Sequence, residues 1–103
     1  MMRADVIRLI TETASAHGVH AAVTETEREV FCTVRSVTRS EYYNALNAGV
    51  QPEIVFVLAL AEDYQGERYA RYHGQKYKIT RTYMTEDDGI ELTAERSDVN
   101  GDE

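Results

Sequence analysis

The sequence of 103 residues contains one cysteine, one proline, no tryptophan and no long apolar run. The single cysteine, Cys32, cannot form a disulfide within the chain, so we expect a protein of a reducing compartment such as the cytosol. The longest apolar run, residues 54–61, is far shorter than the roughly 18 residues that a membrane-spanning helix needs. Residues 1–10 have two basic residues, Arg3 and Arg8, and no long apolar core, so we expect no signal peptide. A chain of this length is expected to form one domain, residues 1–103.

Catalytic and cofactor-binding motifs are also missing. There is no GxGxxG fingerprint and no phosphate-binding loop. His17 and His20 have a spacing found among metal ligands, but no clustered carboxylate or cysteine completes a zinc site. Asp87 and Asp88, preceded by Glu86, could hold a divalent cation, although neighbouring carboxylates in a turn more often form a solvated loop. We predict no catalytic residue, no metal, no cofactor and no enzymatic activity.

Basic residues are outnumbered by acidic ones, 11 to 18, and the formal net charge is −7. Because affinity for nucleic acid comes mostly from neutralising phosphates, so acidic a chain is a poor candidate for coating DNA. One stretch is rich in cations, but Glu67, Asp87 and Asp88 are close to it in sequence, which is typical of a solvated face of mixed sign. Its basic residues are Arg68, Arg71, Lys76, Lys78 and Arg81. The alternative is a barrel of the oligonucleotide-binding type, in which Tyr72 and these cations other than Arg81 bind single-stranded nucleic acid.

Short runs rich in β-branched and aromatic residues occur along the whole chain, separated by turn residues, and such runs are typical of strands. We predict strands at residues 5–13, 19–24, 29–37, 53–61, 67–73, 76–84 and 90–96. Residues 24–29 (TETERE) are expected to form an acidic loop and residues 97–103 a frayed tail. The predicted fold class is mainly β: a small antiparallel β-barrel of about five to seven strands, with one long loop carrying a short helix; a small sandwich is the other closed solution.

Alternation within the runs indicates which side chains face the core. Cys32 shares a face with Val30 and Val34, so it is expected to be a small buried hydrophobic residue rather than a nucleophile. Ile90, Leu92 and Ala94 are expected inward. In the 76–84 run we expect Lys76 to face water, whereas Tyr77, Ile79 and Tyr83 share the apolar face. Arg81 lies on that apolar face too, and because a buried arginine needs a partner, we expect an ion pair with Asp88 or Glu62.

Residues 38–51 stand apart from these runs as a polar segment with two tyrosines. Ser40 is a good N-cap residue, and Tyr42, Ala45 and Leu46 share one helical face, so we predict a short helix over 40–48. Gly49 is placed to end it in the left-handed conformation. A helix this short is marginal alone, so it packs either on its own barrel or on another subunit. Tyrosines on a weakly held element are typical of interface anchors.

Three stretches resemble a known family. They are VTRSEYYNALNAGVQPEIVFVLAL, YQGERYARYHGQKYKITRTY and DDGIELTAER, which together span roughly residues 30–96. In this order they resemble the phage head–tail adaptor family, also called head-closure or head-tail joining proteins, which are small β-barrel neck components. The most specific matches are the EYY, AG and PE elements, the Tyr72-His73-Gly74 hairpin and the Arg81-Thr82-Tyr83 triplet. Many members have a tryptophan near the position of Phe31, where this chain has none.

The resemblance implies a structural protein that forms a ring beneath the portal after DNA packaging, joins the head to the tail and closes the DNA channel. It implies a portal or adaptor ring and a tail-side neck protein as partners, and a homo-oligomeric, twelvefold ring in the virion neck. The isolated protein could be a monomer. The protein would be in the bacterial host cytoplasm during assembly or as a prophage product, with DNA only passing through and no membrane partner. The assembly interface expected in the loop is Arg39, Glu41, Tyr42, Tyr43, Leu46 and Val50.

Overall fold

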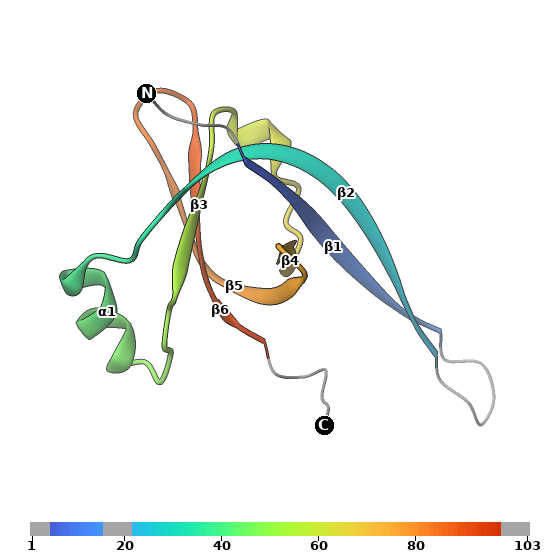
Figure 1. Cartoon of the computed structure of the whole chain (residues 1–103), viewed down its shortest axis with the longest axis horizontal. Coiled ribbons are helices and arrows are strands. Elements are labelled where there is room, and N and C mark those ends of the chain that lie inside the picture. Colours follow the sequence, from blue (N-terminus) through green and yellow to red (C-terminus); the bar gives the residue numbers. More distant parts are fainter. Residues whose placement is uncertain (1–4, 16–21, 98–103) are drawn as a thin grey trace.

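The computed structural model describes residues 5–15 and 22–97, which form a closed six-stranded antiparallel barrel and one α-helix (Figure 1). In chain order the elements are β1 (Asp5–Ser15), β2 (Ala22–Arg35), α1 (Arg39–Leu46), β3 (Ile54–Leu58), the 3-10 helix η1 (Ala61–Asp63), β4 (Tyr69–Tyr72), β5 (Gln75–Met84) and β6 (Ile90–Arg96). Around the barrel the order is β1-β2-β3-β6-β5-β4, and β4 closes the ring against β1. The predicted mainly β barrel with a helix in its one long connection is confirmed.

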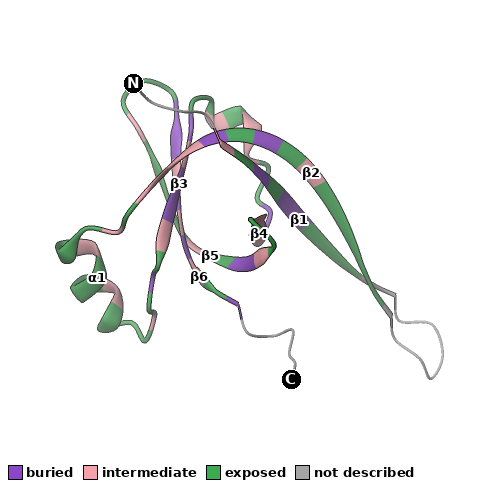
Figure 2. Cartoon of the chain, in the orientation of Figure 1, coloured by how far each residue is buried: buried purple, intermediate pink, exposed green. Residues whose placement is uncertain are grey.

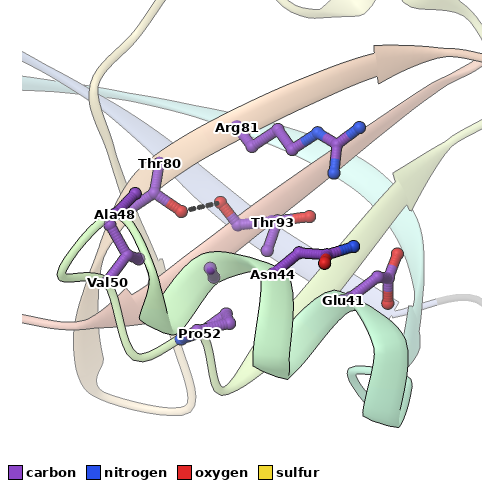
Figure 3. Close-up of a pocket in the computed structure, with 9 residues that line it drawn as sticks. Glu41, Asn44, Ala48, Val50, Pro52, Thr80, Arg81 and Thr93 are labelled. Atoms are coloured by element: carbon purple, nitrogen blue, oxygen red, sulfur yellow. Dashed lines mark hydrogen bonds between the residues drawn. The ribbon is translucent and has the colours of Figure 1, made fainter.

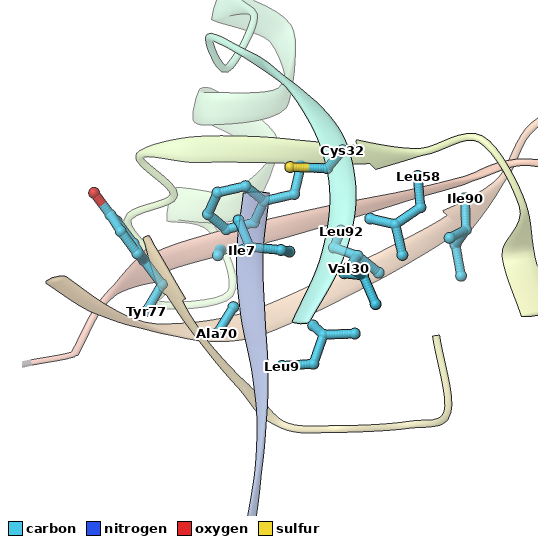
Figure 4. Packing of buried hydrophobic residues seen from close by; sticks show 11 residues of the cluster. Ile7, Leu9, Val30, Cys32, Leu58, Ala70, Tyr77, Ile90 and Leu92 are labelled. Carbon is cyan, nitrogen blue, oxygen red and sulfur yellow. The ribbon is translucent and has the colours of Figure 1, made fainter. Parts of the chain in front are cut away.

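The barrel interior is filled by one cluster of apolar side chains from all six strands (Figure 4). Its buried members are Ile7, Leu9, Val30, Cys32, Phe56, Leu58, Ala70, Tyr77, Ile90, Leu92 and Ala94. They recur at alternate positions because successive side chains of a strand point to opposite faces. At the centre, the Phe56 ring packs edge-to-face against Tyr72 and Tyr77, with ring centroids 5.6 and 5.8 Å apart. The inward positions predicted for Cys32 and for β6 are confirmed.

The hairpin between β4 and β5 turns at the predicted place. Tyr72 pairs with Gln75, which leaves His73 and Gly74 as a two-residue turn. Both have positive φ, 49° and 79°. Two-residue turns with left-handed backbone at both positions match the twist of the flanking strands, and glycine meets that requirement without strain. The HGQ turn signal therefore predicted this hairpin correctly.

β2 is longer than predicted. Residues 24–29, expected to form an acidic loop, belong to a continuous strand that pairs with β1 as far as Ser15. The prediction was wrong because this segment alternates threonine with glutamate and so lacks an apolar period, although threonine itself favours strands. The outer ends of β1 and β2, residues 11–15 and 22–27, form a two-stranded arm that extends beyond the barrel (Figure 1). Of the predicted strand at 19–24, residues 22–24 belong to β2, and residues 19–21 lie outside the described residues.

A bulge in β5 reverses part of the predicted alternation. The register against β6 shifts between Ile79 and Arg81 and leaves Thr80 as an extra residue. Ile79 packs against the core, whereas Arg81 is exposed on the outer surface. The expected burial of Arg81 and its ion pair with Asp88 or Glu62 are therefore wrong. One extra residue turns the side chains that follow it to the opposite face, and no regular alternation in the sequence reveals it.

Lys76 and Tyr83 also differ from expectation. Lys76 was predicted to face water, yet it is only 4% exposed. Its Nζ lies between two carboxylates of the arm, 2.5 Å from Glu12 and 2.8 Å from Glu25. Tyr83, predicted to face the core, follows the bulge and is exposed. Lys76 is thus buried by a contact between segments distant in sequence, whereas Tyr83 is turned outward by the bulge.

The boundaries of α1 differ slightly from the prediction of 40–48. The helix begins at Arg39, and its N-cap is Thr38 rather than Ser40. The Glu41 N–H donates to Thr38 Oγ1 at 3.2 Å, and the Thr38 N–H donates to Glu41 Oε1 at 2.9 Å. This capping box satisfies two backbone donors at the start of the helix. Gly49 has a φ of 78° just beyond the helix, as its predicted left-handed role requires.

Two more predicted segments end at different residues. β3 stops at Leu58 rather than residue 61, because the chain turns into η1. Gly89 approaches this turn so closely that a Cβ there would lie 2.7 Å from the Leu58 carbonyl oxygen. Ser97, assigned to the frayed tail, is buried, and its N–H donates to the Lys76 carbonyl oxygen at 3.0 Å. The rest of that tail lies outside the described residues.

Candidate functional site

The connection between β2 and β3, residues 36–53, lies against the outside of the barrel, and none of the residues of its helix is buried (Figure 2). Val55, on the outer face of β3, is fully buried, and Pro52 in the connection is buried as well. Val55 pairs with Arg35 on one side and with Thr93 on the other. The connection therefore covers a small apolar area of the outer face while α1 itself stays in contact with water.

Arg35 is the main ionic contact between this connection and the barrel. Its guanidinium donates to both carboxylate oxygens of Glu41, at 3.1 and 2.9 Å, and to Glu91 of β6 at 3.0 Å. The hydrogen bond from Arg35, together with the bond from the Thr38 N–H, lowers the pKa of Glu41 to about 2. The same bond to Glu41 raises the pKa of Arg35 further above its already high value. Glu41 thus both caps α1 and holds it on the barrel.

Two tyrosines and Arg39 lie on the solvent side of α1. The side chain of Tyr42 is 39% exposed and that of Tyr43 is 60% exposed. Their rings pack edge-to-face with centroids 5.8 Å apart. Arg39 and both tyrosines line a shallow hollow that continues over Pro52 and neighbouring residues of the connection. Aromatic and arginine side chains of this kind are enriched at the centres of protein interfaces.

The structure separates the six predicted interface residues into two groups. Arg39, Tyr42, Tyr43 and Leu46 are exposed on α1, and their role in assembly stays a prediction. Glu41 and Val50 instead line a groove on the other side of the helix, which we call the α1 groove (Figure 3). The α1 groove has a volume of about 240 Å³. Its lining residues are Glu41, Asn44, Ala45, Ala48, Val50, Pro52, Thr80, Arg81 and Thr93.

Sequence reasoning missed most of the α1 groove. Its apolar side comes from small residues of the connection, and its polar side from β5 and β6 (Figure 3). The bulge at Thr80 brings Arg81 to the rim, and no local pattern signals that bulge. Glu41 and Asn44, three residues apart on α1, were the one available signal for a helix face turned toward the barrel.

A second exposed apolar feature lies on β2. Phe31 is 71% exposed and directly opposite Val6 of β1 in the strand register. Glu29, two residues earlier, is on the same outer face and is exposed. Cross-strand apolar pairs normally gain energy by excluding water, and this pair is left open to solvent.

Two of the four cations considered for nucleic-acid binding, Arg71 and Lys76, are paired with carboxylates of the arm. Lys76 binds Glu12 and Glu25 of the arm, and its Nζ lies 4.5 Å from the centroid of the Tyr69 ring. Arg71 binds Glu25 and Glu27, at 3.3 and 3.2 Å. Burial alone would lower the pKa of Lys76, but the hydrogen bonds to its two carboxylates raise it. The hydrogen bond from Lys76 likewise lowers the pKa of Glu25.

This network compensates an unfavourable pairing in the arm. Glu12 and Glu25 are directly opposite each other in the register, and like charges in that position destabilise a strand pair. Lys76 lies between the two carboxylates and attracts both. Its position indicates a structural role, in which it fixes the direction of the arm relative to the β4–β5 hairpin.

Another ion pair ties β2 to the segment before β4. Arg28 donates to Glu67 at 2.7 Å and to the Asp63 carbonyl oxygen at 2.7 Å. Glu67 also accepts from the Gln65 N–H at 2.8 Å. Burial raises the pKa of Glu67, but the hydrogen bonds from Arg28 and from backbone N–H groups outweigh it and leave the pKa below its ordinary value. The contact is a structural one, because each of its partners is satisfied within the chain.

The candidate nucleophile is buried, and the candidate metal ligands that the structure describes form no cluster. Burial raises the pKa of the Cys32 thiol to about 11, which disfavours the nucleophilic thiolate. Within residues 5–15 and 22–97, no three His, Cys, Asp or Glu side chains are close enough together to hold a metal ion. His17 and His20 lie outside the described residues. No helix in the described part of the chain is long and apolar enough to cross a membrane.

No protein-family model matches this sequence, and a search of curated proteins finds none that is similar to it. Function therefore has to be inferred from the barrel, its outer surfaces and the pattern of residues in the connection.

Proposed function

We propose that this protein is a structural component of a phage neck, which joins the portal vertex of the head to the tail and closes the DNA channel after packaging. The observation that carries the proposal is the connection of residues 36–53, which presents a helix on the outside of the barrel without burying any helix residue. The sequence resemblance to head–tail adaptor proteins includes this connection and the strands around it.

Two parts of the molecule suit this role in different ways. The barrel is a rigid body closed by hydrogen bonds around its whole circumference. The connection offers Arg39, Tyr42, Tyr43 and Leu46 to a partner, and rigid aromatics lose little conformational entropy when they are buried in an interface. The partners in this proposal are a portal or adaptor ring on the head side, a tail-side neck protein, and further copies of the chain in a ring.

The net charge of −7 supports a role in which DNA passes without being held. Tight binding to duplex DNA depends on releasing counterions by phosphate neutralisation, which an acidic surface does not provide. In this proposal the protein has no catalytic role and belongs to the neck of the virion, reached from the cytoplasm of the host during assembly.

The test uses DNA-filled heads that carry the portal but lack this protein, taken from the same phage. Purified protein is added and the portal vertex is imaged by electron microscopy. We expect a new ring of density at the vertex and retention of DNA. No density with folded protein, even after an adaptor ring has been added first, would contradict the proposal.

A pair of variants tests the surface that carries the proposal. Tyr42→Ala combined with Tyr43→Ala is expected to leave the monomer folded and to abolish the new density. Met84→Ala is the matched control, because Met84 is as exposed as Tyr43, at 60%, but lies at the end of β5. Equal loss of density in both variants would mean that the tyrosines are not the anchors.

A further inference from the structure

Phe31 is the most exposed large apolar side chain among the described residues. It stands on the outer face of β2 with Val6 beside it and Glu29 two residues away on the same face. Glu29 forms no ion pair with any other described residue. We call Phe31, Val6 and Glu29 the β2 knob. It combines an apolar projection with an adjacent carboxylate whose cross-strand neighbour, Arg8, pairs with Glu27 instead, at 3.4 Å.

The α1 groove has the complementary chemistry. Ala45, Ala48, Val50 and Pro52 give it an apolar side, and Arg81 lies on its polar side (Figure 3). Arg81 has no ion pair within residues 5–15 and 22–97. An apolar cavity of about 150 Å³ accommodates benzene, so a groove of about 240 Å³ can take one phenyl ring.

The two features are on opposite sides of the barrel. In the order β1-β2-β3-β6-β5-β4, two strands separate β2 from β5 in either direction. Phe31 and Glu29 of the β2 knob belong to β2, Val6 belongs to the neighbouring β1, and Arg81 belongs to β5. A knob and a groove so placed cannot meet within one molecule, but they are well placed to meet between neighbouring molecules.

We propose that the β2 knob of one copy docks into the α1 groove of a second copy, with Phe31 against the apolar side and Glu29 beside Arg81. Such a contact joins two different surfaces, so it repeats from head to tail and closes into a ring when the rotation allows it. Charge complementarity fixes the register and excludes contacts between like surfaces. As the subunit contact of a neck ring, this inference rests on the proposed function, although the contact itself can be measured without phage heads.

The test is disulfide trapping with two single-cysteine proteins. Both carry Cys32→Ala, which removes the native thiol; one adds Glu29→Cys and the other adds Arg81→Cys. Under mild oxidation, we expect a covalent dimer when the two proteins are mixed and none from either protein alone. Dimers from a single variant, or no dimer in the mixture, would overturn the proposal.

Two controls make the result specific. Val23→Cys, exposed on the arm, replaces Glu29→Cys in a parallel mixture and should give no dimer with Arg81→Cys. Adding Phe31→Ala to the productive pair should reduce the rate of trapping about tenfold, the loss expected when an interface anchor is truncated. An unchanged rate would mean that Phe31 is not the anchor.

The outcomes on phage heads separate the two proposals. A ring of density at the vertex without trapping between residues 29 and 81 would leave the neck function standing and refute this contact. Trapping in solution without density at the vertex would refute the neck function and leave the contact as a property of the isolated protein. Charge reversal gives a second measurement: Glu29→Arg and Arg81→Glu should each weaken self-association in sedimentation, and the two together should restore it.

Discussion

The barrel and the α1 connection are held together by different kinds of interaction. The barrel depends on strand pairing and on a filled apolar core, whose stabilisation is roughly proportional to the area removed from water. The connection depends on the Arg35–Glu41–Glu91 contact, a capping box and a small covered area around Val55. Salt screens ionic contacts near the surface, and low pH removes the charge of their carboxylates. The stabilisation from buried apolar side chains does not depend on these charges. Conditions can therefore exist that release α1 and leave the barrel folded.

The largest expected effect is in the barrel core. Phe56→Ala removes the central ring from between Tyr72 and Tyr77 and should lower the free energy of unfolding by about 3–5 kcal/mol, measured by urea denaturation. Phe31→Ala is the matched control, because its ring is exposed, and should change stability by no more than about 0.5 kcal/mol. Similar losses of unfolding free energy in Phe56→Ala and Phe31→Ala would contradict the assignment of Phe56 to the core and Phe31 to the surface.

A smaller effect is expected where the arm meets the barrel. Lys76→Met leaves Glu12 and Glu25 facing each other with only Arg71, 3.3 Å from Glu25, to offset their repulsion. The change should cost about 1–2 kcal/mol, less than the loss of a fully buried partner, because both carboxylates are partly exposed. Adding Glu25→Gln removes the repulsion and should recover part of the loss. No recovery would show that Lys76 acts through packing against Tyr69 instead of through charge.

The attachment of α1 should depend on pH. The pKa of Glu41 is lowered to about 2 from an ordinary value of 4.5. A carboxylate with a depressed pKa stabilises the attached state fully above its ordinary value, and this contribution is lost as pH falls from 4.5 toward 2. We expect the NMR signals of the Tyr42 and Tyr43 rings to shift over that range while the core signals persist.

Glu41→Gln provides the control for that titration. The variant retains a hydrogen-bonding side chain but loses the titrating charge, so the pH-dependent shift of the tyrosine signals should disappear. A shift of unchanged size and midpoint in Glu41→Gln would assign the titration to another group.

The smallest effect is expected at the helix cap. Thr38→Ala removes the side-chain acceptor for the Glu41 N–H and should destabilise α1 by about 1 kcal/mol, with little change in global unfolding. Hydrogen exchange of the α1 amides measures this local loss. Ser40→Ala should have no comparable effect because Ser40 is not the cap. Faster exchange in both variants would indicate that helix propensity, and not capping, limits the stability of α1.

The sequence was most informative where one local pattern decides the structure. Alternating apolar residues located the core face of β6 and placed Cys32 inward, and the turn residues located the β4–β5 hairpin. Failures arose where partners distant in sequence decide. Thr24–Glu25–Thr26 is a strand because β1 pairs with it, Lys76 is buried because two arm carboxylates surround it, and Arg81 is outside because of one extra residue at Thr80.

The two candidate surfaces on the connection also differ in whether a local pattern or a distant partner determines them. The tyrosines of residues 38–51 could be singled out from composition and spacing alone, and both are exposed, while their role as interface anchors stays a prediction. The α1 groove could not, because its two sides come from a connection and from two strands that follow it by about thirty to fifty residues, and because its arginine had been assigned to the core. A surface made by tertiary contact carries no signature within any single segment.

The filled interior of the barrel determines where DNA could travel in the proposed neck. Because aromatic rings pack across its centre, a single barrel has a filled interior and no lumen of its own. In the proposed neck, any passage for a double helix must therefore be an opening enclosed by several copies of the protein. The diameter of this opening then depends on the number of copies in the ring and on the tilt of each copy, and not on the number of strands in the fold. Changing the contact between copies would resize that opening without altering one residue of the core.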